Sequence, residues 1–287
     1  MKYEIRRRED GKEAIFDENG NQISPEWFDE IEPYGLLRGE SEYYIAIKDM
    51  QYAIFDKNGN RISDWFDAIS PVGLVGGESN YYLAKKDGKK AIFDINGDMI
   101  TKEWYDDISP YGLVGRESPY YIAKKDNKWT IFDEKGNQIS QWFDDISFYG
   151  LIKGQSEYYI AEKDGERAIF DRNGNRISDW FDYICPDGLV KGESDYYIAF
   201  KDDKFAVYHK SGKKVSGDFS KEYFPYIDGK ITFDENLGIV EIKMLGGLTK
   251  ETIEFNPFIK EEIIDYTKLL NIWNQFHKGG KRNEIWD

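Results

Sequence analysis

A segment of 38 or 39 residues recurs along this chain, and this repetition limits its possible folds more than any other feature. The core of the segment, Ala-Ile-Phe-Asp or a variant of it, begins at six places: Ala14, Ala53, Ala91, Thr130, Ala168 and Ala206. A period in this range is typical of repeat proteins, in which each unit buries its apolar side chains against its neighbours. The sequence predicts a repeat domain over residues 1–216, with five full units and a degenerate sixth, and a non-repeat region over residues 217–287.

Each unit contains short runs with the composition of β-strands. In the second unit, a tyrosine-rich run at 43–46 is followed by a run at 53–56 and, after Asp-x-Asn-Gly-Asn, by a third run at 61–63. Aromatic and β-branched residues between Gly, Asn and Asp favour antiparallel hairpins, and Asn-Gly is a strong hairpin signal. We therefore expect an all-β, open, twisted array of antiparallel hairpin units. The same strands also fit a closed propeller of five or six blades.

An element made of tryptophan, a second aromatic residue and aspartate follows in the five full units. Its tryptophans are Trp27, Trp65, Trp104, Trp142 and Trp180. We expect the indoles to fill the gaps between units, with the aspartate bonded to a neighbouring backbone amide or to the indole. The alternative is a row of stacking platforms for sugars, as in repeat lectins. Two units carry one extra residue next to the tryptophan, which would disturb a shared ligand geometry more than it would disturb packing.

Residues 128–137 and 142–145, followed by Gly150-Leu151, resemble the bacterial WG, or KWG, repeat. Units of that family run Lys-Trp-Gly, an aromatic-Ile-Asp strand, a turn with glycine, an aromatic-Asp-Asp element and Gly-Leu. The resemblance covers about residues 1–216, although only Trp129 keeps the tryptophan of the name and no unit keeps the following glycine. It implies a β-repeat module that mediates protein contacts and has no shared catalytic residues.

Residues 217–287 break the repeat and predict a small mixed cap. Runs at 230–233, 239–243 and 252–255 indicate strands, and Asn256-Pro257 is a typical helix start. Apolar residues then recur at helical spacing up to His277: Ile259, Ile263, Tyr266, Leu270 and Trp273. We expect this helix to dock on a partner. The first tyrosine of each tyrosine pair is the other candidate contact: Tyr43, Tyr81, Tyr120, Tyr158 and Tyr196.

The polar motifs indicate turns and not catalytic or metal-binding sites. The Asp-x-Asn-Gly-Asn turns resemble the start of a calcium loop, but Lys135 takes the middle position once and no bidentate glutamate follows. A turn whose aspartate caps backbone amides explains the same pattern. The repeated Gly-Glu-Ser predicts a local bond from side chain to backbone, because His209 and His277 lie outside the regular units and leave the serines without a base. Cys185 takes a slot that holds serine elsewhere. We expect no catalytic residue, metal or cofactor.

The overall charge narrows the choice of partner. With 54 acidic and 39 basic residues the formal charge is -15, which disfavours nucleic acid and anionic membranes and suits a basic protein partner. One cysteine, no apolar run long enough to span a membrane and no signal peptide indicate a cytoplasmic protein. The sequence predicts a non-catalytic scaffold or regulator that binds a protein through its acidic repeat surface and its C-terminal helix. The alternative is a carbohydrate-binding repeat module.

Overall fold

The computed structural model describes residues 3–220, 230–243 and 250–254, and this part of the chain is all-β apart from one short 3-10 helix. The elements are β1 (Tyr3–Arg7), β2 (Glu13–Asp17), β3 (Glu30–Ile31), η1 (Gly35–Leu37), β4 (Tyr43–Lys48), β5 (Gln51–Asp56), β6 (Ala68–Gly73), β7 (Tyr81–Lys86), β8 (Lys89–Asp94), β9 (Asp107–Ile108), β10 (Tyr120–Lys125), β11 (Lys128–Asp133), β12 (Asp145–Ile146), β13 (Tyr158–Lys163), β14 (Glu166–Asp171), β15 (Tyr183–Ile184), β16 (Tyr196–Lys201), β17 (Lys204–His209), β18 (Phe219–Ser220), β19 (Lys230–Asp234), β20 (Ile239–Lys243) and β21 (Lys250–Glu254). No helix in the described ranges is long and apolar enough to cross a membrane.

Every repeat hairpin after β1–β2 is completed by a strand from the unit before it. The hairpin β7–β8 of the third unit pairs with β6, which ends the second unit, and all neighbours are antiparallel. The same order recurs in β3-β4-β5, β9-β10-β11, β12-β13-β14 and β15-β16-β17. This arrangement differs from the expectation for residues 61–63, which form only an isolated bridge between Arg61 and Phe55. The prediction of an all-β repeat built from small antiparallel hairpins is confirmed.

The segment between two hairpins bonds to both of them. Phe66 exchanges two backbone hydrogen bonds with Tyr52 of its own unit, at 2.8 and 2.9 Å. The next residue, Asp67, donates its backbone N–H to the carbonyl of Lys85 in the following unit, at 2.9 Å. Backbone hydrogen bonds therefore cross the unit boundary, where they satisfy groups on strand edges that would otherwise lack partners.

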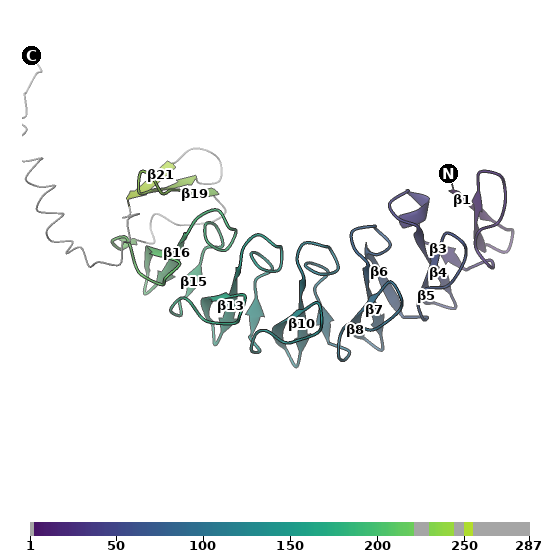
Figure 1. Cartoon of the computed structure of the whole chain (residues 1–287), viewed down its shortest axis with the longest axis horizontal. Helices are drawn as coiled ribbons and strands as arrows, with labels where there is room; N and C mark the ends of the chain where they lie inside the picture. The colour runs from purple at the N-terminus through teal and green to yellow at the C-terminus, as the bar shows by residue number, and fades with distance from the viewer. Residues whose placement is uncertain (1–2, 221–229, 244–249, 255–287) are drawn as a thin grey trace, which may run out of the picture.

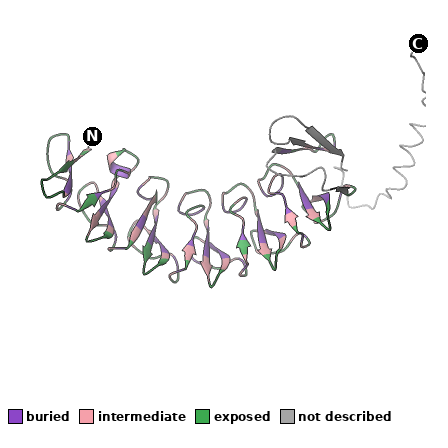
Figure 2. Ribbon diagram, turned by 180° about the vertical axis from the view of Figure 1, so that it is seen from behind, coloured by how far each residue is buried: buried purple, intermediate pink, exposed green. Residues whose placement is uncertain are grey.

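The core is a row of clusters, and each cluster combines side chains of two adjacent units. In the first cluster, Phe28 of the first unit lies 5.0 Å from Phe55 of the second, centroid to centroid, and Tyr44 stacks on Phe55 at 5.5 Å. In Figure 2, buried residues, coloured purple, recur in the strands of one unit after another. Because a two- or three-stranded sheet of this size is barely stable alone, the units depend on this shared burial.

Glycine sets the spacing between units. Gly150 has a φ of +74°, and a Cβ atom placed on it would lie 2.1 Å from the carbonyl oxygen of Tyr158. The same atom would lie 2.9 Å from the carbonyl oxygen of Val190 in the next unit. A side chain at this position would therefore push the following unit away.

The units lie side by side along an open arc, with β1 at one end and β19–β21 at the other (Figure 1). Ile231 of β19 and Val240 of β20 pack with Ile198 and Val207 of the sixth unit, so this sheet covers the last cluster. The three strands expected in this region are present. The helix predicted over residues 257–277, with its candidate contacts Ile259, Ile263, Tyr266, Leu270 and Trp273, lies outside the described residues.

Candidate functional site

The Asp-x-Asn-Gly-Asn turns are closed by their first aspartate. Asp56 Oδ1 accepts hydrogen bonds from the backbone N–H groups of Asn58 and Asn60, both at 2.8 Å. Equivalent bonds occur at Asp17, Asp94, Asp133 and Asp171. At Asp17 the side-chain amide and backbone N–H of Asn21 hold the pKa of the carboxyl below its ordinary value. The predicted capping role is confirmed. The carboxylates are therefore used for hydrogen bonds within their own turns.

The Gly-Glu-Ser motif closes a loop and also links two units. Glu78 Oε2 accepts the backbone N–H of Gly73 at 2.9 Å, which is the local bond that the sequence predicts. Ser79 Oγ donates to the carbonyl of Val114 in the next unit at 2.6 Å, a contact that sequence reasoning missed. The same serine bridge is made by Ser41, Ser118 and Ser156. These hydroxyl groups are therefore structural.

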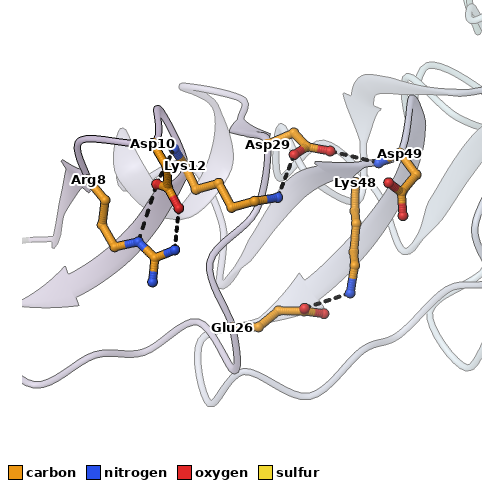
Figure 3. Close-up of polar contacts among 7 residues, drawn as sticks. All are labelled: Arg8, Asp10, Lys12, Glu26, Asp29, Lys48 and Asp49. Carbon is orange, nitrogen blue, oxygen red and sulfur yellow. Dashed lines mark hydrogen bonds and ion pairs between the residues drawn. The ribbon is translucent and has the colours of Figure 1, made fainter.

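The aspartate of the Trp-aromatic-Asp element bridges neighbouring hairpins, as the close-up of the first boundary shows (Figure 3). Asp29 Oδ2 accepts the backbone N–H of Asp49 at 2.7 Å, and its Oδ1 accepts the ammonium of Lys12 at 2.7 Å. Both contacts lower the pKa of Asp29, with the Lys12 bond contributing most. The bond to the next turn recurs at Asp67, Asp106, Asp144 and Asp182.

The indoles lie half-buried at the boundaries between units. Trp65 contacts Phe28 of the preceding unit at 6.4 Å and Phe55 of its own unit at 6.1 Å, between ring centroids. Trp27, Trp104, Trp142 and Trp180 are also half-buried. The residue after the tryptophan, such as Phe66, is the one that is fully enclosed. The indole thus covers the gap from outside while its neighbour fills it.

The tyrosine row contributes to the same packing. Tyr43 packs against the cluster formed by the second and third units. Tyr81, Tyr120 and Tyr158 are likewise half-buried, and Tyr196 is buried. Each of these rings therefore presents at most part of its surface to a partner. Cys185 is buried as well, and burial raises the pKa of its thiol to about 12.

Three positions depart from the repeat in each of the five sheets that combine a hairpin with a strand of the preceding unit, and the strand register places them next to one another. Glu162 of β13 lies opposite Asp145 of β12 and Arg167 of β14. Cross-strand neighbours project from the same face of a sheet. The five sets of three are Glu30, Ile47 and Tyr52; Ala68, Lys85 and Lys90; Asp107, Lys124 and Trp129; Asp145, Glu162 and Arg167; Tyr183, Phe200 and Phe205. We call these fifteen residues the variable face.

Contacts join successive parts of the variable face. Lys90 Nζ lies 2.6 Å from Asp107 Oδ1 of the next sheet. Further along, the guanidinium of Arg167 lies over the ring of Tyr183 at 5.4 Å from its centroid. The variable face is therefore continuous at these two boundaries.

A cavity of about 410 Å³ opens where the variable face passes from β12–β14 to β15–β17. Its apolar walls include Ile146, Phe148 and Ile160. Asp145, Glu162 and Arg167 supply its charged lining, and Glu162 pairs with Arg167 at 3.0 Å. Phe148 is 39% exposed and stands where the other four full units have proline: Pro33, Pro71, Pro110 and Pro186.

The aromatic residues beside this cavity form an exposed stack. Phe148 stacks on Tyr111 at 5.4 Å and lies 4.6 Å from Tyr149, between ring centroids. The ammonium of Lys153 lies over these rings, 4.9 Å from the centroid of Tyr111 and 5.1 Å from that of Phe148. Within the described ranges, no group of three or more His, Cys, Asp or Glu residues is arranged to hold a metal ion.

No protein-family model and no curated protein sequence matches the chain. It is similar to the solved structure of Kluyveromyces lactis Hsv2 with its complete loop 6CD, at 12% identity and a TM-score of 0.34, covering 81% of this chain and 76% of that one. It is also similar to the β-propeller domain of Myceliophteria thermophila Cps50 (Swd1), at 10% identity and a TM-score of 0.30, covering 88% of this chain and 96% of that one. At these TM-scores the likenesses assign neither a function nor a partner to the chain.

Proposed function

We propose that this chain is a non-catalytic scaffold that binds a protein partner on its variable face. The observation that carries the proposal is the contrast between a repeated framework and three unrepeated positions per sheet. Bonds within the turns constrain the turn aspartates, and packing and bonding between units constrain the bridging serines and the spacing glycines. The variable face carries no such common constraint, and its residues range from aliphatic and aromatic to cationic and anionic.

The residue types on the variable face suit recognition of a protein. Tyr52, Trp129 and Tyr183 are half-exposed there, and large aromatic residues and arginine are enriched at the centres of protein interfaces. Positions that were merely tolerant of change would be expected to hold small or charged residues on a solvated sheet. Phe205 is buried in the last core cluster, but the open arc presents the exposed and half-exposed members of the variable face in succession, which suits an extended partner. The net charge of -15 favours a basic one.

The repeated serines, the turn aspartates and the cysteine have structural roles, which supports a non-catalytic function. The repeated serines bond to backbone carbonyls, the turn aspartates cap amides, and the Cys185 thiol is buried with a raised pKa. A role as a β-repeat module that mediates protein contacts also agrees with the resemblance to the WG repeat, which we carry forward as part of the proposal.

Site-specific photo-crosslinking tests this proposal. A photoreactive amino acid is placed at Lys124 on the variable face or, as a control, at Lys135 in the Asp-x-Asn-Gly-Asn turn of the same unit, and the full chain is expressed in its native cells. We expect a protein to be crosslinked from position 124 and not from 135. Trp129→Ala, which removes a half-exposed aromatic side chain from the variable face, should weaken its capture in pulldowns, and Lys135→Ala in the turn should not.

Two results would refute the proposal. One is equal crosslinking from both positions. The other is selective retention of a glycan on a carbohydrate array together with no protein crosslink from position 124, which would establish the carbohydrate-binding alternative.

A further inference from the structure

We infer that the cavity beside Asp145 binds a lysine side chain of a basic protein segment. This inference rests on the proposed function and names the chemistry of the partner at one point of the variable face. Asp145 is exposed at the cavity, and no described residue donates a hydrogen bond to its carboxylate or forms an ion pair with it.

The preceding unit shows what a carboxylate in this slot accepts. Asp107 occupies the same slot there, and the ammonium of Lys90 bonds to it at 2.6 Å. One unit later the slot of Lys90 is filled by Trp129, which has no charge to offer Asp145. The chain thus supplies its own lysine at one boundary and omits it at the next.

The lining of the cavity matches the rest of a lysine side chain. Ile146, Phe148 and Ile160 provide apolar surface for the four methylene groups, which lysine commonly lays along such surface while its ammonium stays near water.

The charge of the lining also favours a cation. Glu162 and Asp145 contribute two carboxylates, and Arg167 neutralises one of them through its pair with Glu162. One negative charge therefore remains in a partly enclosed site, where ion pairing is screened less than on an open surface.

The shape of the site depends on one departure from the repeat. Phe148 replaces the proline of the other full units and builds one wall of the cavity. At the preceding boundary the equivalent positions hold Pro110 and Trp129. The aromatic wall of the cavity is therefore specific to this unit.

The experiment measures the affinity of the full chain for an acetylated, amidated pentalysine peptide by calorimetry at about 0.1 M salt, where exposed charges are screened beyond roughly 10 Å. We expect Asp145→Asn to weaken binding about fivefold, which corresponds to the upper end of the range of affinity changes caused by losing an exposed ion pair. The matched control is Asp98→Asn, which removes the same charge at a turn and introduces the residue that most of the other units carry there. It should change the affinity less than about twofold, and so should Asp107→Asn, because the Asp107 carboxylate already holds Lys90.

A second variant tests the apolar wall. Phe148→Pro introduces the residue of the other four full units, so the array should still fold, and it should weaken pentalysine binding by a similar factor. Circular dichroism and the urea midpoint verify that both variants are folded.

Three outcomes would overturn the inference. Equal losses in Asp145→Asn and Asp98→Asn would show general attraction to an acidic chain. Undiminished binding of the peptide with its five lysines acetylated would show that no ammonium is recognised. Preferential binding of pentaglutamate would place the contact at Lys85 and Lys124 instead. In each case, a protein crosslinked from position 124 would leave the proposed function standing, so the two failures are distinguishable.

Discussion

Replacing Gly150 by alanine should destabilise the chain far more than replacing Gly165, although both glycines have positive φ. Gly165 lies in a hairpin turn with a φ of +83° and no atom within 4 Å of an added Cβ. Gly165→Ala should therefore cost only the backbone term, about 1–2 kcal/mol. At Gly150, with a φ of +74°, the same Cβ would lie 2.1 Å from the carbonyl oxygen of Tyr158 and 2.9 Å from Val190, both in the fifth unit.

Relief of that clash requires the fifth unit to move, and two further costs follow. Overpacking of this kind costs about 1–3 kcal/mol. Movement of Val190 also stretches the hydrogen bond from Ser156 Oγ to its carbonyl, now 2.6 Å, which contributes about 1 kcal/mol. We therefore expect Gly150→Ala to cost about 3–6 kcal/mol in total.

Urea titration followed by circular dichroism and tryptophan fluorescence gives the free energy of unfolding and its dependence on urea. For Gly150→Ala we also expect the two signals to separate, because a strained boundary lets the halves of the array unfold independently. If the two alanine variants differ by less than about 1 kcal/mol, then steric contact at Gly150 does not set the spacing between units.

Four further changes test other parts of the structure. Tyr121→Phe removes a buried hydroxyl that has no hydrogen-bond partner among the described residues, so the free energy of unfolding should stay equal or rise by up to about 1 kcal/mol, and a marked loss in a urea titration would show that the hydroxyl is bonded. Arg116→Gly removes a side chain from a backbone with a φ of +58°, so the urea midpoint should rise by the equivalent of about 0.5 kcal/mol; a lower midpoint would mean that the arginine contributes stabilising contacts. The pKa of Asp17 in the folded state is lowered from 3.8, so its carboxylate contributes fully to stability above the unfolded-state pKa, and this contribution disappears as pH falls through the folded-state pKa. Asp17→Asn should therefore flatten the acid side of the stability–pH curve, and an unchanged slope would contradict the capping bonds. The Cys185 thiol, with its pKa raised to about 12, should resist an aromatic disulfide reagent at pH 8 until urea unfolds the chain, and fast modification of the native protein would contradict its burial.

Local signals in the sequence were sufficient to predict the repeated hairpins. Each pair of long strands is adjacent in the chain and is joined by a turn with Asp, Gly or Asn, so composition and spacing predict it. The third strand of each sheet was predicted incorrectly at residues 61–63. It is formed instead by short segments such as β9, whose two residues carry no readable periodicity. Their pairing depends on contacts with the following unit, which no local pattern encodes.

The candidate site was less accessible to sequence reasoning for the same reason. The slot that holds Tyr52, Lys90, Trp129 and Arg167 is visibly unrepeated in the sequence. Its neighbours on the sheet face become apparent only from the strand register. The cavity beside Asp145 further requires the loop that carries Phe148 to fold against the next sheet. By contrast, the capping role of the turn aspartates was predictable, because those bonds span at most four residues.

The donation of a short strand from each hairpin unit to the next has a consequence for how such chains can lengthen. Inserting or deleting one whole period among the first five units would leave the remaining junctions with the same donated strand, the same serine bond to a carbonyl and the same aspartate bond to a turn, because the junctions between these units use the same parts. Copy number can therefore change by in-frame duplication without inventing a new junction. Every added copy would extend the row of recognition positions by three residues that are free to acquire their own specificity.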